Sequence, residues 1–452
     1  MKKLFFIAAI TVVVGAKAQE HFAGISTSKR VGIINLEVNP SELANLKNHF
    51  EIQLLSSSMT ISNNKVGFSD LLDDTNAENL ILAGDKPINF NFNLESIGPG
   101  VAVRLLKWRF AVTSKVNLKA GMLNVDPILA SYLTGSDVHE IPVGDFRDRE
   151  FLANQRFNGT IWGEVGFAVA RKVWENEKGL LNAGVNVKLL FPGSYANMGI
   201  GNFQGTISND GSDLLLTDAD ADVNFAYSGS LSKNFTNSNQ YTSSLYGNLD
   251  GLAADFGVDY QLKKGNSYKI KLGASIMNLG SMRFNDRDNL STTYKLKVSG
   301  TQSLVLNYFD GIEDMIEIKQ HLIDEAVQGN IEFTEITSNK DFKVNLPTTF
   351  NLYADVNLIS KLNVTLFTQQ KLHSNSSNSQ ITSQTIYSVT PRFGIGFFEA
   401  YLPISYNDFS GNNAGLGFRL GGFFMGSNSV LSAMSSNTKQ ADLHFGFRFA
   451  IL

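Results

Sequence analysis

Apolar and polar residues alternate one by one over several long stretches of this chain. The clearest are residues 88–94, 181–189, 252–262, 350–358 and 443–451. In each of them an apolar residue recurs at every second position, and mostly Asn, Asp, Gly, Lys or Arg stands between. Successive residues of a β-strand point to opposite faces of the sheet, so each stretch predicts a strand with one apolar and one polar face. The chain is therefore expected to be all-β.

Two architectures produce such strands. A soluble sandwich hides the apolar faces between two sheets, whereas an outer-membrane barrel turns them toward lipid and keeps the polar faces inside. Many stretches reach the roughly 9–11 residues that a tilted strand needs to cross a bilayer, which exceeds the about 5–6 usual in soluble sheets. Aromatic residues recur near strand ends, where the membrane interface would lie. They are Trp108, Phe110, Trp174, Tyr268 and Tyr401. These features favour the barrel.

Short and long connections alternate along the chain. Short ones fall near residues 106–107, 176–179, 263–266 and 359–361. Long ones span residues 62–87, 121–156, 191–251 and 281–345. Short periplasmic turns that alternate with long outer loops are typical of outer-membrane barrels. The pattern contains fifteen candidate strands, including residues 180–191, 195–207, 213–230 and 414–424, but such barrels have an even number. We therefore predict a closed antiparallel transmembrane β-barrel of about fourteen strands, and we expect the miscount within residues 191–251.

Two segments of the long connections have helical patterns. Residues 310–326 begin with Asp310, a good N-cap residue, and then place apolar residues on one helical face. Residues 126–133 are a shorter candidate, with Pro127 in the first turn. We expect short helices in the outer loops, where either could fold over the mouth of the barrel.

The first residues predict export. Lys2 and Lys3 precede an apolar run, and Ala16-Lys17-Ala18 has the small-x-small pattern of a signal-peptidase site. The apolar run is shorter than the about 20 residues that a membrane-spanning helix needs. Residues 1–18 are therefore expected to be a cleaved signal peptide, and the mature protein is expected in the bacterial outer membrane, in contact with its lipid.

Composition excludes several kinds of function. The chain has no Cys, so disulfides and thiolate metal sites are impossible. It carries 38 Lys and Arg against 42 Asp and Glu, and losing the three lysines of the signal takes the net charge from −4 to −7. Nucleic-acid binding needs basic patches, so a nucleic-acid partner is not expected.

The sequence offers little for catalysis or metal binding. His444 falls on an inward face without a Ser partner, and we find no metal-ligand spacing, phosphate loop or nucleophile elbow. We therefore predict neither an enzyme nor a bound cofactor or metal. Asp218, Asp220 and Asp222 could supply oxygen ligands to Ca²⁺. No Gly-anchored loop frames them, so a solvated acidic outer loop is the favoured interpretation.

Charged residues recur on the polar faces that a barrel would turn toward its lumen. They are Glu164, Lys188, Asp255, Asp259, Lys269, Lys271, Asp355, Arg419 and Arg448. They could line a selective pore, or they could form a structural network of ion pairs. Burying an unpaired charge costs several kcal/mol, so lumenal charges must pair or meet water. We favour the ion-pair network.

Several motifs resemble those of a known superfamily. The stretch Asn39-Pro40-Ser41-Glu42-Leu43-Ala44 is similar to the N-P-A-x-L-A stretch near the start of FadL-like and PorV-like outer-membrane barrels, with Ser41 in place of Ala. Further stretches resemble a branch of uncharacterised outer-membrane barrels in that superfamily. They are residues 98–100, 162–166, 345–349, 390–393, 402–406, 421–422 and 426–427.

The resemblance implies a barrel of residues 49–452 whose N-terminal segment, residues 19–48, enters and partly plugs the lumen. Asn39, Pro40 and Leu43 would form the plug motif. Pro40 disfavours helix at Asn39, and Asn and Ser side chains cap turns, so a structural anchor is favoured over a ligand contact.

Relatives in the superfamily either import hydrophobic molecules or serve secretion machinery. We expect a plugged barrel that admits or holds a small hydrophobic molecule. The alternative is a non-transporting partner barrel of a secretion or surface-assembly system. It would bind proteins through residues 121–156, 191–251 and 281–345.

Overall fold

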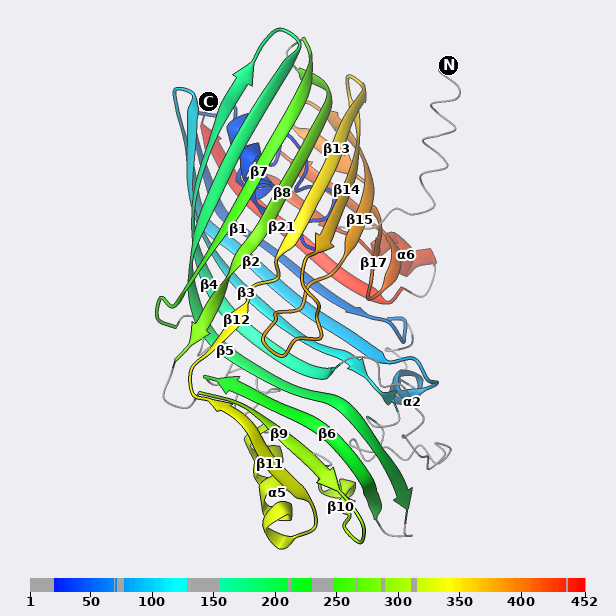
Figure 1. Cartoon of the computed structure of the whole chain (residues 1–452). Helices are drawn as coiled ribbons and strands as arrows, with labels where there is room; N and C mark the ends of the chain where they lie inside the picture. The colour runs from blue at the N-terminus through cyan, green and yellow to red at the C-terminus, as the bar shows by residue number, and fades with distance from the viewer. Residues whose placement is uncertain are drawn as a thin grey trace.

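The first and last strands of the chain pair with each other. In the computed structural model, β1 (Phe50–Asn63) lies between β2 (Ile88–Leu105) and β21 (Gln440–Ile451), antiparallel to both (Figure 1). The structure describes residues 20–68, 70, 77–127, 130, 154–209, 213–229, 247–265, 267–285, 289–309, 315–435 and 438–451. The expected signal peptide lies outside these residues and stays a prediction. The expected closed antiparallel barrel is confirmed.

The barrel has fourteen strands. From β2 the wall continues through β3 (Trp108–Val125), β4 (Gln155–Glu175), β5 (Gly179–Asn209), β7 (Gly251–Lys264), β8 (Ser267–Phe284), β13 (Thr349–Ile359), β14 (Leu362–Lys371) and β15 (Ile386–Ile395). It closes through β16 (Phe398–Tyr401) with β17 (Ile404–Asn407), β18 (Gly411–Ala414) with β19 (Leu416–Leu420), and β20 (Phe423–Ser427). Each of these two pairs of short strands makes one interrupted barrel strand, and β12 (Phe342–Asn345) extends β13 along β8.

Three errors in the expected strands, two that add a strand and one that removes one, account for the difference between the fifteen candidates and the fourteen strands of the barrel. The candidates 180–191 and 195–207 are one strand, β5, which continues through an irregular pairing near Pro192. The candidate 213–230 is β6 (Leu214–Ser228), which lies outside the barrel. The candidate 414–424 divides into β19 and β20, because Gly421 has a positive φ of 58° and forms a tight turn. Only two of these errors fall within residues 191–251.

The two ends of the barrel differ. Short turns at residues 106–107, 176–178, 360–361, 396–397 and 421–422 lie at the same end as the start of β1 and the end of β21, at the top of Figure 1. The long connections lie at the opposite end. Short turns mark the periplasmic side of such barrels, so we call these ends the periplasmic end and the outer end.

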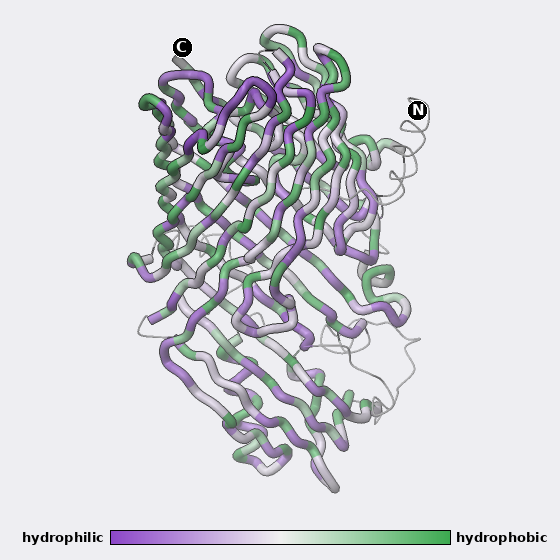
Figure 2. The backbone as a smooth tube through the Cα atoms, turned by 45° about the horizontal axis from the view of Figure 1, so that its top comes forward, coloured by the Kyte–Doolittle hydropathy of each residue, from purple (hydrophilic) through white to green (hydrophobic). Residues whose placement is uncertain are grey.

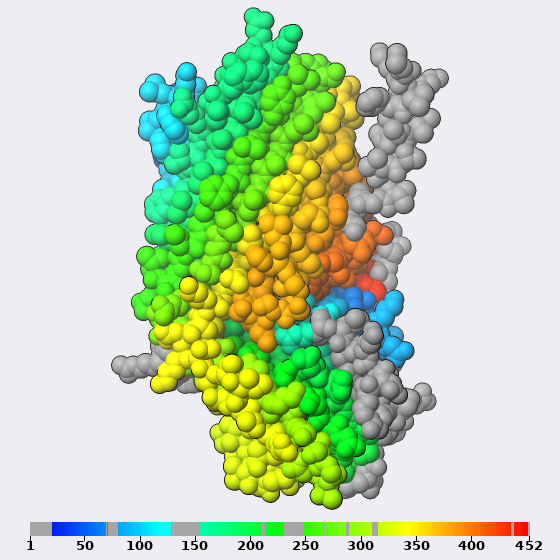
Figure 3. All heavy atoms as spheres, viewed as in Figure 1, coloured from blue at the N-terminus to red at the C-terminus, as the bar shows by residue number. Residues whose placement is uncertain are grey.

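A lobe projects from the outer end (Figures 1 and 3). Strand β5, which is 31 residues long in all, extends beyond the barrel rim, and β6 and β9 (Leu290–Val298) continue the sheet to β11 (Glu332–Asn339). The strand β10 (Leu304–Val305), the 3-10 turn η6 (Leu306–Phe309) and α5 (Met315–Gln328) complete the lobe around an apolar core that also includes Ile161 of β4.

The short helices follow the expectation in part. The helix expected over 310–326 is α5, although its first positions, 310–314, lie outside the described residues. Most of the helix expected over 126–133 also lies outside them. Two further short helices are α2 (Ala77–Leu82) and α6 (Val430–Ser435). None of the helices described is both long and apolar enough to cross a membrane.

The apolar faces of the strands point outward. Phe256, Val258 and Phe445 are 46%, 47% and 38% exposed, whereas their neighbours Asp255 and His444 are 0% and 1% exposed. Figure 2 shows this alternation as interleaved hydrophobic and hydrophilic positions along the strands. A soluble monomer rarely exposes so extensive an apolar surface, and closure satisfies every barrel strand edge as hydrocarbon requires. The protein is therefore an outer-membrane barrel.

The expected belt of interfacial aromatic residues is right for three of its five members. Trp108, Phe110 and Trp174 are exposed on the outer surface near the periplasmic end. Tyr268 and Tyr401 are 5% and 1% exposed and face the lumen, so their assignment to the belt is wrong. A bulge where β7 meets β8 rotates Tyr268 inward, because Leu262 pairs with Ile270 while Lys263 pairs with Tyr268.

Candidate functional site

Residues 20–48 run inside the barrel (Figure 1). They form two 3-10 turns, η2 (Gly32–Glu37) and η3 (Pro40–Asn45), joined by an extended Asn39. Most of their side chains are buried against the inner face of the wall. We call residues 20–48 the N-terminal segment.

Asn39 fixes the bend between the two turns. Its Oδ1 accepts hydrogen bonds from the backbone nitrogen of Ser41 at 2.9 Å and from the Ser41 hydroxyl at 2.7 Å. Its Nδ2 donates to the carbonyl oxygen of Val258 at 2.9 Å and reaches that of Ala274 at 3.3 Å. The same side chain thus caps η3 and fastens the segment to β7 and β8.

Glycines in the wall make room for this bend. Gly184 and Gly257 pair across β5 and β7 on the inward faces. A Cβ on Gly257 would stand 1.9 Å from Asn39 Oδ1, and a Cβ on Gly184 would stand 2.4 Å from the carbonyl oxygen of Pro40. Only glycine permits so close an approach between backbone and wall.

The apolar side chains of the segment meet two apolar areas of the inner wall. One area consists of alanines from β2, β3 and β4, and it receives Ile33, Leu36 and Leu43. The alanines are Ala102, Ala111, Ala168 and Ala170. The other area, around Ile97 and Phe424, receives Phe22 and Ile25. Leu43 therefore packs on small side chains of the wall.

Ion pairs hold the segment near the periplasmic end. Glu42 lies 2.5 Å from Lys271 Nζ and accepts a hydrogen bond from the Tyr353 hydroxyl. Glu51 at the start of β1 accepts from the backbone nitrogen of Ile33 at 2.8 Å and pairs with Arg448 at 2.5 Å.

Asp355 and Arg392 continue this network across the wall. They pair at 3.0 Å, and Arg392 also donates to Thr27 Oγ1 of the segment at 2.6 Å. Asp259 is buried and accepts hydrogen bonds from Asn182 at 3.0 Å and 3.1 Å. Ion pairs and hydrogen bonds therefore hold the N-terminal segment to both sides of the barrel.

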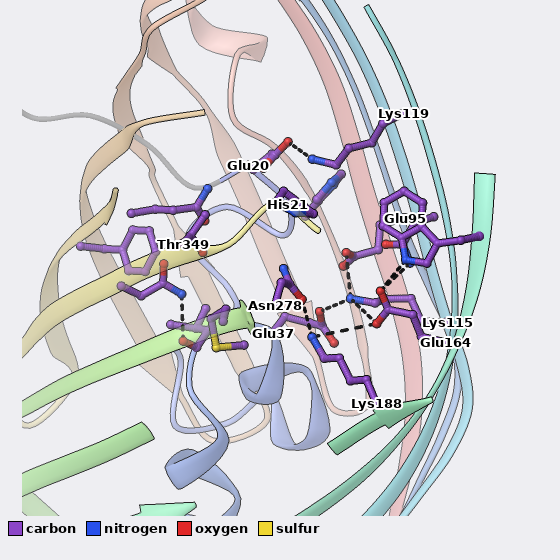
Figure 4. A pocket seen from close by; sticks show the side chains of 18 residues that line it. Glu20, His21, Glu37, Glu95, Lys115, Lys119, Glu164, Lys188, Asn278 and Thr349 are labelled. Atoms are coloured by element: carbon purple, nitrogen blue, oxygen red, sulfur yellow. Dashed lines mark hydrogen bonds and ion pairs between the residues drawn. The ribbon is translucent and has the colours of Figure 1, made fainter. Parts of the chain in front are cut away.

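A second charged cluster lies in the middle of the lumen (Figure 4). Lys115 of β3 is surrounded by three carboxylates, with Glu37 of the segment at 2.9 Å, Glu95 at 3.3 Å and Glu164 at 3.5 Å. Lys188 pairs with Asp255 at 2.9 Å and lies 4.0 Å from Glu164. In a medium of low polarity such charges persist only when they compensate one another, as they do here.

Glu20 and His21 begin the described chain and lie beside this cluster (Figure 4). Glu20 pairs with Lys119 at 2.6 Å, and His21 Nδ1 lies 3.1 Å from the Ser58 hydroxyl. Burial lowers the pKa of His21 to about 4, with Glu20 opposing the shift. Burial raises the pKa of Glu37 although Lys115 opposes the shift. His21 is therefore neutral when docked at ordinary pH.

The connection between β14 and β15 folds over the lumen from the outer side. Residues 372–385 place Gln380 and Ile381 in buried positions. Arg156 of β4, 0% exposed, donates to the carbonyl oxygens of Asn375 at 2.5 Å and Gln380 at 3.1 Å. We call residues 372–385 the lid loop, since it covers the lumen opposite the N-terminal segment.

Little space remains between the segment and the lid loop. The central cavity, of about 70 Å³, is lined by Glu20, Glu37, Glu95, Lys115, Lys188 and Phe367, among others (Figure 4). A volume of this size with charged walls suits a few water molecules.

The charged residues predicted for the lumen separate into two groups. Seven of them are buried on inward faces: Glu164, Lys188, Asp255, Asp259, Lys271, Asp355 and Arg419. Arg448 also faces inward and is partly buried, with 11% side-chain exposure. The prediction for Lys269 is wrong, because the bulge that turns Tyr268 inward leaves Lys269 exposed. Three further lumenal cations, Lys115, Lys119 and Arg392, are missing from the prediction. The first two could have been found, because polar residues alternate with apolar ones over residues 115–119.

The histidine and the aspartates considered for catalysis and for Ca²⁺ binding both contact other side chains of the protein. His444 Nε2 lies 2.9 Å from the Tyr401 hydroxyl, and the rings of His444 and Phe22 meet edge to face. Asp218, Asp220 and Asp222 lie on a strand, β6, and not in a loop. Lys295 of β9 forms ion pairs with Asp220 and Asp222 there.

A closed barrel with an apolar exterior and a lumen filled by its own charged and apolar residues defines an integral outer-membrane protein. The chain belongs to a family of unknown function, DUF5723, whose model matches residues 40–428. This match confirms the expected relation to uncharacterised barrels. No curated protein matches the sequence.

Solved structures of similar shape include transporters. The Pseudomonas putida toluene transporter TodX is 9% identical, with a TM-score of 0.41 over 96% of this chain and 94% of that chain. The Ralstonia pickettii toluene transporter TbuX is 9% identical, with a TM-score of 0.40 over 94% and 95%. A Pseudomonas aeruginosa FadL homologue is 9% identical, with a TM-score of 0.41 over 96% and 98%. Identities this low carry no activity to this chain.

Proposed function

We propose that this protein is a gated outer-membrane barrel that admits or holds a small, largely apolar molecule. The N-terminal segment is its plug, with Asn39, Pro40 and Leu43 as the anchor. The observation that carries the proposal is that residues 20–48 fill the lumen with side chains that match the wall behind them.

The plug covers apolar wall surface. Its apolar side chains lie on the alanines of β2 to β4 and on Ile97 and Phe424. Withdrawal of the plug would uncover these areas inside an otherwise polar lumen. An apolar solute that enters would then replace the plug's own contacts, which supports an apolar cargo.

The present conformation is closed. The central cavity of about 70 Å³ is charged and suits water, so no drug-sized molecule fits there. Opening requires the plug or the lid loop to move, and segments that close a site in this way commonly move as units.

Uptake by liposomes tests the proposal. The protein is reconstituted as the mature chain and as a variant that lacks residues 22–44, and the entry of toluene and of other small apolar solutes is measured. We expect faster entry through the deletion variant than through the full chain. Equal, negligible flux in both would count against transport, provided that each protein shows the heat-dependent electrophoretic shift of a folded barrel.

A partner barrel is the second candidate, and the lobe favours it. The lobe carries exposed apolar side chains on its surface, including Tyr308 at 60% and Ile336 at 53% exposed, well beyond the barrel rim. Such a projection offers a surface to another protein of a secretion or surface-assembly system. Crosslinking in native membranes separates the two functions: a stoichiometric protein partner favours this candidate, and lumenal lipid or apolar solute favours transport.

A further inference from the structure

A second hollow opens at the periplasmic mouth of the barrel. It has a volume of about 480 Å³ and lies between the plug and the turns after β15 and β19. Five cationic side chains line it, against the two carboxylates of Glu42 and Glu51. They are Lys29, Arg30, Lys47, Arg419 and Arg448. The hollow is therefore rich in positive charge although the protein as a whole is acidic.

The two carboxylates are already engaged. Glu42 pairs with Lys271 at 2.5 Å, and Glu51 pairs with Arg448 at 2.5 Å while it also accepts from the backbone of Ile33. Neither is free to neutralise the remaining cations of the hollow.

Arg419 on β19 is the most deeply buried of these cations. Its residue is 5% exposed, yet no carboxylate among the described residues lies within 4.0 Å of its guanidinium. Its Nη1 donates to the carbonyl oxygen of Gly421, and its buried Nε has no partner within the described part of the chain. A buried guanidinium with an unused donor is costly, which favours a ligand that accepts from it.

Arg30 of the plug completes the cationic wall. Its Nη1 donates to the carbonyl oxygen of Gly396 at 2.8 Å, and its Nε lies 3.4 Å from Glu399. These contacts hold the guanidinium in place beside the hollow. Lys29 reaches the same hollow and donates to the Ser267 hydroxyl at 3.2 Å. Cations from the plug and from the wall thus face one space.

We propose that this hollow is an oxyanion site that takes the carboxylate or phosphate group of a small molecule. Arg419 is its fixed ligand, and Arg30 and Lys29 approach from the plug. The guanidinium fork matches the geometry of both oxyanions, which a point charge does not. A bound anion would bridge wall and plug and so hold the plug docked. The site does not depend on transport, because a barrel that moves no cargo would still bind the anion.

Calorimetric titration of the detergent-purified mature chain tests the site. The probes are inorganic phosphate and octyl phosphate. We expect Arg419→Gln to weaken binding by about tenfold or more, because it removes a charge-assisted hydrogen-bond donor. Arg419→Lys keeps the charge without the fork and should fall between. The matched control Arg171→Gln removes an exposed cation at the same end of the barrel, outside the hollow, and should leave binding unchanged.

The probes also distinguish the source of the anion. Binding of both phosphates, each weakened by Arg419→Gln, supports a site for a free anion. Binding of octyl phosphate alone, weakened by the same variant, supports a site for the headgroup of an amphiphile. The proposal is overturned if neither probe binds, or if Arg419→Gln and Arg171→Gln have equal effects.

Plug docking gives a second readout that does not depend on affinity. The chain has no Cys, so Ala23→Cys provides a single thiol at a position that is 3% exposed. A saturating concentration of octyl phosphate should slow the labelling of this thiol severalfold in the Ala23→Cys protein. The same concentration should have no such effect when Arg419→Gln is added to Ala23→Cys. Labelling that the probe leaves unchanged in both proteins would overturn the bridging role.

Discussion

At the scale of single residues, a missing Cβ determines how closely the plug approaches the wall. Gly257→Ala would place a methyl group 1.9 Å from Asn39 Oδ1, so Asn39 must move and lose its bonds to Val258 and Ser41. We predict a loss of about 1–3 kcal/mol in the free energy of unfolding, typical of overpacking. Urea unfolding from lipid vesicles measures it.

Gly201→Ala is the control for this change. The nearest atom to its Cβ would be 3.6 Å away, an ordinary contact. Its effect should be within about 0.5 kcal/mol, as for most surface changes. Equal effects of the two alanines would show that the plug does not sit against Gly257.

Lys115 is a second residue on which the lumen depends. Lys115→Met would leave Glu37, Glu95 and Glu164 together without their common cation. Removing one partner of a buried ion pair costs about 3–5 kcal/mol, so we predict a loss of that size at neutral pH. The same urea experiment measures this loss.

The control is Lys172→Met, which breaks a half-exposed pair with Glu175 and should cost less than about 1 kcal/mol. A Lys115 variant as stable as this control would refute the network.

At the scale of elements, the plug should respond to acid through His21. Its docked pKa of about 4 lies below the ordinary 6.5, so the undocked plug binds the proton more readily. The contribution of His21 to docking is complete above pH 6.5 and is lost as the pH falls toward 4. At pH 5 the loss is about 2 kcal/mol, or roughly thirtyfold in the docking equilibrium.

Thiol labelling of Ala23→Cys at pH 7.5 and pH 5 measures this loss. The rates are divided by those of Lys107→Cys, an exposed turn position, to remove the acidity of the thiol itself. The ratio should rise as the pH falls, and His21→Gln should abolish most of the rise. A rise of equal size in both proteins would assign the effect to other groups, such as Glu20.

The elements also show what alternation along the sequence could predict. Period-two patterning gave the closed barrel and the inward parity of residues such as Asp255 and Asp355, because parity survives along an unbroken strand. It failed at Tyr268 and Lys269, because a bulge shifts parity by one residue and has no signature in the pattern. The partners of each charge, such as Glu37 for Lys115, depend on barrel closure and long-range register, which one sequence does not contain.

At the scale of the whole molecule, the apolar exterior and the charged lumen have one origin. Because strand residues alternate between the two faces of the wall, a strand that turns its apolar face toward lipid must turn its charged face toward the lumen. The outer-end lobe and the lid loop are additions to this plan, whereas the fourteen-stranded wall around the N-terminal segment is its basis. If the apolar faces met each other and not hydrocarbon, the lumen, the plug and the anion site would all be lost.

Fluorescence quenching by brominated phospholipid tests this arrangement most directly. The chain has three Trp residues, and Trp162 is 2% exposed with its Nε1 donating to Glu164 at 2.8 Å. A variant that keeps only Trp162 should be almost unquenched in vesicles of brominated lipid. A variant whose only Trp is at position 256, made by Phe256→Trp, should be strongly quenched, because that position is 46% exposed on the outer face. Equal quenching of the two, or stronger quenching of Trp162, would contradict the account.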